Sequence, residues 1–333
     1  MSRTPNPAFQ SIPIMQEALD LTNISSPNPE DRRTLAQEVR DACINVGFFY
    51  VKNHGIPEDF ISGALTMAER FFSLPSEDKM EIENRKSPNF MGYSPLLSGN
   101  NDPEGGGDLQ EGFEFGWEEL EQSSISDESK KEAGAMAGSN VWPTQVPGFR
   151  EAVLQYYHAA VKLGKSLFPI FALALNQEED FFSDKTQHSA ALLKLLHYPP
   201  QTGPVDERVI GIGAHTDWEC FTILWQQPGI EALQVLNSEK QWIKAPPIPG
   251  TLVINLGDQL ARWTNDHFKS TVHRAINRSG VRRYSIPLFF GTDYNVPLEA
   301  IPSCVSETNP YKYEVITAGE YVKSRLQATY NHH

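Results

Sequence analysis

The chain has 333 residues, enough for two domains or for one large β-barrel domain with attached helices, and enough to bury a sizeable core. Hydrophobic residues make up 40% of it and charged residues 21%, a globular mixture that excludes a largely disordered chain. The 42 acidic residues outnumber the 28 lysines and arginines, and the net charge of −14 argues against a nucleic-acid binder and a polybasic membrane-surface protein.

The first half of the chain alternates helix and strand patterns. Leu35, Val39 and Ile44 have helical spacing, and Gly47 suits the cap of that helix. Between residues 98 and 138 the chain is turn-rich and then acidic without an apolar period, so we expect an insertion that acts as a lid over a pocket. The expected elements are helices at 31–46, 57–72 and 149–176, and a strand at 48–51.

From residue 189 onward, short β-prone runs recur with turn signals between them, which predicts a sandwich or barrel of antiparallel strands. A last helix is expected at 318–329. The runs are 189–198, 208–214, 220–225, 232–236, 241–244, 250–257, 271–277 and 282–290.

Nothing in the sequence predicts a secreted or membrane protein. No apolar run reaches membrane-spanning length, and the first residues lack the apolar core of a signal peptide. The three cysteines, Cys43, Cys220 and Cys304, are odd in number and widely spaced, which favours a reduced compartment over a disulfide framework or a zinc site. We therefore expect a cytoplasmic protein that binds neither nucleic acid nor membrane. The sequence leaves its oligomeric state open.

His215-Thr216-Asp217 is the main candidate for chemistry. It ends a strand-like run, and residues two apart on a strand point to the same side. One imidazole and one carboxylate therefore project together. With one more nitrogen they would form a facial triad, which holds iron(II) and leaves positions open for a reaction.

The third ligand must come from another strand. His267 lies in a Thr-Asn-Asp-His segment that is typical of a turn, whereas His273 lies within the strand candidate at 271–277. We therefore predict His273 as the third ligand.

The next strand carries a candidate anion clamp. Arg283, Ser285 and Phe289 share one face of it, and a guanidinium beside a hydroxyl suits a carboxylate. A buried Arg without an anion would be costly, so a dicarboxylate shared between clamp and metal is implied. Pro287 removes one backbone donor, which predicts a bulge or an unpaired stretch in this strand.

Each of these residues also has a simpler interpretation. Most isolated His-x-Asp triplets bind nothing, a lone His273 would be a core histidine, and a lone Arg283 would be a surface charge. The prediction depends on their occurrence in this order, on strands and on shared faces.

That order, together with four further segments, resembles the iron(II)/2-oxoglutarate-dependent dioxygenases of the isopenicillin N synthase-like family. The likeness covers nearly the whole chain but does not specify a substrate. The segments are Gly47-Phe48-Phe49-Tyr50-Val51-Lys52-Asn53-His54-Gly55-Ile56, Phe71-Phe72-Ser73-Leu74-Pro75, Met91-Gly92-Tyr93 and Leu196-His197-Tyr198-Pro199-Pro200.

The resemblance implies a mainly β fold with flanking helices, a double-stranded β-helix or jelly-roll barrel. Residues 1–150 would form the N-terminal helical and strand region with its lid, and 151–333 the jelly-roll core with a long scaffold helix and a C-terminal helix. His215, Asp217 and His273 would bind iron(II), with O2 as the oxidant.

The same resemblance implies that Arg283, Ser285 and Tyr198 would bind 2-oxoglutarate. Leu196 stands where many plant members have asparagine.

The resemblance also implies the reaction: oxidative decarboxylation of 2-oxoglutarate to succinate and carbon dioxide, coupled to oxidation of an unactivated C–H bond of a small organic metabolite. Hydroxylation is the expected outcome, with desaturation or ring rearrangement as branches. Secondary or nucleobase metabolism is the expected setting. Two alternatives remain at this point: an iron oxidase or cyclase that does not use 2-oxoglutarate, and a non-catalytic ligand-binding barrel.

Several residues are candidates for the substrate pocket. Trp218 follows the metal carboxylate, and Lys194 could meet an acidic or carbonyl group, although a solvated lysine is the simpler interpretation. Because aromatic residues fill barrels in any case, ordinary core packing is the competing interpretation for the others. These others are Phe289 on the clamp face, and Phe113, Phe115 and Tyr93 as a roof from the N-terminal region.

Overall fold

The computed structural model describes residues 17–98, 107–120, 139–201 and 211–330. Its described strands form two sheets. The large sheet has the order β1-β2-β10-β7-β12-β5-β4-β3, and the small sheet has the order β6-β11-β8-β9. The strands are β1 (Leu19–Asp20), β2 (Phe48–Lys52), β3 (Gly92–Ser94), β4 (Glu111–Phe115), β5 (Ala191–Tyr198), β6 (Ile212–His215), β7 (Phe221–Gln226), β8 (Leu233–Leu236), β9 (Trp242–Lys244), β10 (Thr251–Leu256), β11 (His273–Ala275) and β12 (Arg283–Phe290).

The predicted β region is confirmed. Each of the eight runs expected after residue 189 overlaps one strand, from β5 to β12, although residues 208–210 of the second run lie outside the described residues. Most of these strands pair, antiparallel, with strands that do not follow them directly in sequence. Leu233 and Val235 of the small sheet pack against Phe48, Tyr50 and Val253 of the large one, so the two sheets face each other across a shared interior. This arrangement matches the expected jelly-roll barrel.

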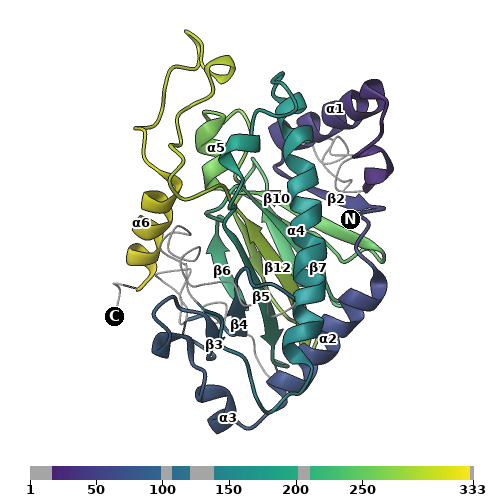
Figure 1. Ribbon diagram of the computed structural model, residues 1–333, viewed down its shortest axis with the longest axis vertical. Coiled ribbons are helices and arrows are strands. Elements are labelled where there is room, and N and C mark those ends of the chain that lie inside the picture. Colours follow the sequence, from purple (N-terminus) through teal and green to yellow (C-terminus); the bar gives the residue numbers. More distant parts are fainter. Residues whose placement is uncertain (1–16, 99–106, 121–138, 202–210, 331–333) are drawn as a thin grey trace, which may run out of the picture.

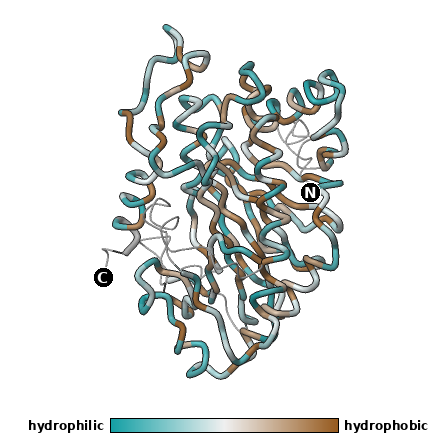
Figure 2. Tube along the Cα trace, viewed as in Figure 1, coloured by the Kyte–Doolittle hydropathy of each residue, from teal (hydrophilic) through white to brown (hydrophobic). Residues whose placement is uncertain are grey.

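Helices cover the outer face of the large sheet. In Figure 1, α4 runs the length of the strands, and α4 packs against α1, α2 and β12. Hydrophobic residues concentrate in the central strands, and the exposed outer turns are hydrophilic (Figure 2). The helices are α1 (Pro29–Asn45), α2 (Glu58–Phe72), α3 (Ser76–Met80), α4 (Phe149–Ala174), α5 (Asp258–Trp263) and α6 (Ala318–Tyr330), with short 3-10 turns at Leu21–Asn23, Asn84–Lys86, Ser183–Lys185 and Pro302–Cys304.

Local chemistry explains where the first helix begins and ends. Asn28 accepts a hydrogen bond from the backbone N–H of Glu30, and Pro29 occupies the first turn, where no backbone donor is needed. At the other end Gly47 has a φ of +73°, and a Cβ there would lie 2.0 Å from the carbonyl oxygen of Lys269. Only glycine permits both that conformation and that approach, so the cap predicted at this position is confirmed.

Side-chain alternation gives the large sheet two different faces. The outer face packs under the helices and is mainly apolar, with Glu111 and His197 as a buried polar pair on it. The inner face, which we call the lumen face, carries mixed chemistry on β5, β7, β10 and β12. Its members include Tyr198, Leu196, Lys194, Thr222, Gln226, Asn255, Arg283, Ser285 and Phe289, as the strand register shows. The register therefore determines which side chains are available for chemistry.

The expected lid at 98–138 is corrected where the structure describes it. Residues 111–115 form β4, a fully buried strand of the large sheet that pairs with β5. Residues 111–115 therefore belong to the wall of the barrel and do not form part of a lid. Residues 99–106 and 121–138 lie outside the described residues.

The unpaired stretch expected at Pro287 is present. Pairing of β12 with β5 runs through Ser285, stops, and resumes at Leu288 in the same register, so no bulge forms. On its other side, Pro287 stays in register with Leu224 of β7.

All three cysteines are free. Within the described ranges, every helix is too short or too polar to span a bilayer.

Candidate active site

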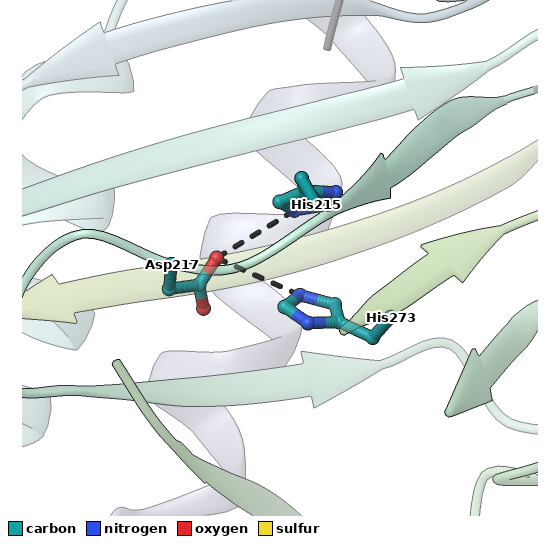
Figure 3. A group of neighbouring side chains, drawn as sticks. All are labelled: His215, Asp217 and His273. Atoms are coloured by element: carbon teal, nitrogen blue, oxygen red, sulfur yellow. Dashed lines mark ion pairs between the residues drawn. The ribbon is translucent and has the colours of Figure 1, made fainter. Parts of the chain in front are cut away.

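The three predicted metal ligands converge. His215 ends β6, His273 begins β11, and Asp217 lies on the loop beyond β6 (Figure 3). Asp217 Oδ1 lies 3.6 Å from His215 Nε2 and 3.5 Å from His273 Nε2. One ligand atom from each side chain lies within 4.8 Å of the others. His215 and His273 are direct partners in the register of β6 and β11, which explains how two distant segments meet.

Both imidazoles are oriented by the backbone. His215 Nδ1 donates to the carbonyl of Gly213 at 2.7 Å, and His273 Nδ1 donates to the carbonyl of Thr271 at 3.1 Å. These bonds place the proton on Nδ1 and leave the lone pair of Nε2 directed at the centre of the triad. Such outer hydrogen bonds are the usual way in which a protein fixes histidine ligands.

The carboxylate is oriented by the large sheet. Asn255 Nδ2 on β10 donates to Asp217 Oδ2 at 2.7 Å, and the Thr222 hydroxyl on β7 donates to the same oxygen. Oδ1 is thereby left to face the two imidazoles. The sequence analysis missed Thr222 and Asn255, because nothing in their local pattern distinguishes them from other strand residues.

The protonation states of the three predicted ligands suit a bound cation. Burial alone would raise the pKa of Asp217, but His273, His215 and the Thr222 hydroxyl outweigh it and hold that pKa well below its usual range. Burial and the neighbouring His215 lower the pKa of His273 to about 4. Burial opposes protonation of His215 too, but the adjacent Asp217 carboxylate raises its pKa. A carboxylate beside neutral imidazole nitrogen is the donor set that suits iron(II).

The clamp residues lie further along the lumen face. Arg283 is 1% exposed, and its Nε and Nη1 atoms have no hydrogen-bond partner among the described residues. Its Nη2 lies 3.5 Å from Gln226 Oε1, and its guanidinium lies 4.7 Å from the ring centroid of Tyr198. Burial lowers the pKa of Arg283. A buried guanidinium with unpaired donors fits a site for an anion such as a carboxylate.

Register places the other clamp residues beside Arg283. Tyr198 pairs with Arg283, and Leu196 pairs with Ser285. Leu196 and Tyr198 form a small apolar cluster with Ala232 and Ala275, so the position held by asparagine in many plant members is here part of an apolar wall. Leu196 therefore offers the clamp no hydrogen bond, whereas Tyr198 beside it carries a hydroxyl.

A second carboxylate connects the metal loop to the rest of the fold. Asp258, the first residue of α5, accepts hydrogen bonds from Thr216 Oγ1 at 3.1 Å, Ser270 Oγ at 2.7 Å and Tyr321 Oη at 2.7 Å. The backbone N–H of Asp258 donates to the carbonyl of Asp217 at 2.8 Å. Asp258 therefore joins the residue between two ligands, the approach to β11 and helix α6. Sequence reasoning missed it.

The roof predicted from the N-terminal region is corrected. Phe113 and Phe115 pair with Leu195 and Leu193, all on the outer face, and both rings are fully buried in the core under the helices. Phe113 contacts Phe71 and Phe149 edge-on, with ring centroids 5.1 Å and 5.0 Å apart.

Tyr93 lies on the same outer side, and its hydroxyl donates to Glu111 Oε2 at 2.6 Å. These three residues are core packing, because β4 is a wall strand whose aromatic side chains point away from the lumen.

The remaining pocket candidates have mixed positions. Phe289 and Lys194 lie on the lumen face, with Lys194 Nζ 5.9 Å from the Phe289 ring centroid. Trp218 is half-buried beyond the metal loop, 5.9 Å from the guanidinium carbon of Arg325 on α6. The competing histidine, His267, lies apart from the triad and contacts Arg40 Nη2 at 3.1 Å.

Two family models match the chain. One, described as non-haem dioxygenase in morphine synthesis N-terminal, matches residues 17–145. The other, described as 2OG-Fe(II) oxygenase superfamily, matches residues 189–292 and thus spans the triad and the clamp.

Named relatives cover almost the full length. The 2-oxoglutarate-Fe(II) type oxidoreductase hxnY of Emericella nidulans is 36% identical over 96% of this chain and 91% of its own. Homoarginine-6-hydroxylase 2-ODD-233 of Oryza sativa is 32% identical over 96% and 97%. A full-length Neurospora crassa protein, crystallised in complex with alpha-KG and 5-formyluracil, superimposes with a TM-score of 0.80, at 29% identity over 94% of this chain and 96% of that one.

The chain therefore belongs to the non-haem iron(II)/2-oxoglutarate-dependent dioxygenases, in the isopenicillin N synthase-like family. The jelly-roll fold and the enzyme class predicted from the sequence are confirmed, as are the cofactor iron(II) and the cosubstrates 2-oxoglutarate and O2. It is an oxidoreductase that acts on a small molecule.

Proposed function

We propose that this dioxygenase oxidises a C–H bond of a small organic metabolite, with His215, Asp217 and His273 as iron ligands and Arg283, Ser285 and Tyr198 as the 2-oxoglutarate site. The observation that carries the proposal is a convergent His-Asp-His group together with a buried arginine on the lumen face, two of whose donor atoms have no partner among the described residues. One named relative is a 2-oxoglutarate-Fe(II) type oxidoreductase and another a homoarginine-6-hydroxylase, and the Neurospora crassa structure is described with 5-formyluracil.

Bound iron(II) with O2 and 2-oxoglutarate supplies the oxidising power, and the chain supplies position and environment. Thr222 and Asn255 hold Asp217 Oδ2, and the carbonyls of Gly213 and Thr271 hold the two imidazoles. Arg283 would pair with the distal carboxylate of 2-oxoglutarate through its unpaired Nε and Nη1 atoms. Leu196 and Tyr198 exclude water beside it.

An oxidase that holds a substrate carboxylate in the same clamp is not favoured, because the relatives are named for 2-oxoglutarate. The three ligands converge and the clamp arginine is present and buried, which argues against a non-catalytic barrel. We further propose a cytoplasmic location and no nucleic-acid or membrane partner, on the acidic charge and the free cysteines.

The test is an anaerobic titration of the metal-free protein with iron(II) and then 2-oxoglutarate, followed by visible absorption. A metal-to-ligand charge-transfer band is expected in the wild type and in the matched control His267→Ala, since His267 lies outside the triad. His215→Ala should bind iron weakly and show no band. Iron binding without a band in the wild type would assign the clamp to a substrate carboxylate and refute the 2-oxoglutarate site.

A further inference from the structure

The strand that carries His215 lies at the edge of the small sheet. β6 pairs with β11, and among the described strands it has no second neighbour. A side chain from a distant part of the chain bonds one of its backbone donors: Gly213 N–H donates to Asp108 Oδ1 at 2.8 Å. Asp108 belongs to the segment before β4 and is not a member of the metal group. A carboxylate thus satisfies a strand donor two residues before a metal ligand.

The pairing of β6 with β11 changes register directly before this ligand. His215 pairs with His273, but the residue two positions further along β11 pairs with Ile212, three positions back along β6. Two residues of β6, Gly213 and Ala214, therefore stand opposite one residue of β11, which is the count of a β-bulge. A bulge bends its strand and changes the direction of the side chain next to it. The direction of the His215 ring therefore depends on the backbone at Gly213.

Both backbone polar groups of Gly213 are hydrogen-bonded. Its carbonyl accepts from His215 Nδ1 at 2.7 Å, and its N–H donates to Asp108 Oδ1. Glycine has more backbone freedom than any other residue, so its conformation has to be fixed by bonds to its backbone. The first bond sets the rotation of the imidazole ring. The second fixes the backbone to which that ring is bonded.

Asp108 is itself held in position. It is 4% exposed, and its own carbonyl accepts from the backbone N–H of Leu97 at 3.1 Å. Three residues later the chain enters β4 at Glu111, which pairs with β5 in the barrel wall. Because a buried carboxylate is costly unless it is hydrogen-bonded, the bond from Gly213 also stabilises Asp108 in this place.

The negative charge of Asp108 also acts on the ligand, but weakly. Burial opposes protonation of His215, the adjacent Asp217 raises the pKa of His215, and Asp108 contributes the smallest of the effects that raise it. A charge acts on a cation through space, whereas a hydrogen bond acts on the geometry of the backbone. The small effect of the charge favours the hydrogen bond as the main contribution of Asp108.

We propose that Asp108 is a positioning residue of the iron centre: by accepting the Gly213 N–H it fixes the bulge of β6 and so directs Nε2 of His215 at the metal. This inference rests on the proposed function, because it concerns the iron(II) that the same triad would bind. The large sheet orients Asp217, and the segment before β4 orients His215.

The test is an anaerobic titration of the metal-free protein with iron(II), followed by 2-oxoglutarate and visible absorption. Asp108→Ala should weaken iron(II) binding about 10- to 100-fold, as is usual when a group that orients a metal ligand is removed. At saturating iron(II) and 2-oxoglutarate, the charge-transfer band of this variant should be displaced from the wild-type wavelength, because the imidazole approaches the metal from a changed direction.

Two conservative variants separate the hydrogen bond from the charge, and they keep the test decisive if Asp108→Ala does not fold. Asp108→Asn keeps an oxygen acceptor at the same place without the charge. It should bind iron(II) within about threefold of the wild type and show the wild-type band. Asp108→Glu keeps the charge but moves the carboxylate by one methylene, so its affinity should fall with that of Asp108→Ala.

Asp293→Ala is the matched control. Asp293 Oδ1 accepts from the backbone N–H of His188 at 2.8 Å, across the same 105 positions that separate Asp108 from Gly213. Both of these control residues lie outside β6 and β11. The variant loses a bond of the same kind and length, and its iron(II) affinity and charge-transfer band should equal those of the wild type.

The proposal is overturned if Asp108→Ala binds iron(II) as tightly as the wild type, even with a lowered melting temperature, since the bond would then serve stability alone. It is also overturned if Asp108→Asn loses as much affinity as Asp108→Ala, because the charge would then be the active element. In both cases a wild type that binds iron(II) and gives the band leaves the proposed function intact. Failure of the wild type to bind iron(II) refutes the proposed function and the inference with it.

Discussion

Replacing Arg283 with methionine should affect stability and cosubstrate binding in opposite ways. The variant should fold at least as stably as the wild type, but it should bind 2-oxoglutarate much more weakly. The guanidinium is buried, and its Nε and Nη1 atoms have no hydrogen-bond partner among the described residues. An unsatisfied buried donor costs about 1–3 kcal/mol, and replacing buried charge by apolar side chains is often neutral or stabilising. We therefore expect the free energy of unfolding of metal-free Arg283→Met to equal or exceed that of the wild type by about 1 kcal/mol.

Binding should change the other way. Two charge-assisted hydrogen bonds to a carboxylate contribute about 1.5–3 kcal/mol each, so the affinity for 2-oxoglutarate should fall by about 10²- to 10⁴-fold. At 100 times its dissociation constant, 2-oxoglutarate stabilises the iron-loaded wild type by about 2.7 kcal/mol. The same concentration should leave the iron-loaded variant almost unshifted.

The assay is urea unfolding under anaerobic conditions, of metal-free protein and of iron-loaded protein with and without 2-oxoglutarate. Arg282→Met is the control, since Arg282 is exposed and directly precedes Arg283, the first residue of β12. It should retain the full ligand shift. The reasoning is refuted if 2-oxoglutarate stabilises Arg283→Met as much as the wild type, or if the metal-free variant loses several kcal/mol while the control does not.

Two further outcomes are expected. Asn255→Ala removes the 2.7 Å bond to Asp217 Oδ2 and should lower iron(II) affinity about 10- to 100-fold in anaerobic titration, with an unchanged value showing that Thr222 alone orients the carboxylate. Burial would raise the pKa of Glu111, but hydrogen bonds from His197, Lys79 and Tyr93 lower that pKa below its ordinary value of 4.5. The ionised Glu111 carboxylate therefore stabilises the fold above pH 4.5, and this stabilisation is lost as the pH falls through the lowered pKa. Glu111→Gln should thus be about 3 kcal/mol less stable than wild type at pH 7, and this gap should close below pH 4.5; a gap independent of pH would contradict the ion-pair explanation.

The sequence was most informative where patterns are local. Strand alternation and turn residues predicted β5 to β12, and the His-x-Asp triplet needs only the period of one strand to bring His215 and Asp217 together. His273 could be chosen over His267 because only one of them lies in a β-prone run. These inferences need no knowledge of which strands are neighbours.

Contacts between segments that are distant in the sequence could not be predicted from it. Glu111–Phe115 reads as Glu-Gly-Phe-Glu-Phe, with a glycine and two carboxylates, and its pairing with β5 makes it a strand. Register then decides that Phe113 points to the helices and Glu114 to the lumen, because a shift of one residue would exchange them. The contacts of Asn255 with Asp217 and of Asp258 with Tyr321 join residues 38 and 63 positions apart.

Asp258 couples the loop that carries the metal ligand Asp217 to helix α6. One carboxylate accepts from the metal loop, from the approach to His273 and from helix α6, so docking of α6 and the geometry of the ligands share the same hydrogen bonds. Coupling of this kind is reciprocal. Filling the metal site must therefore slow amide exchange in a helix that contributes no ligand, and loosening that helix must release metal more readily.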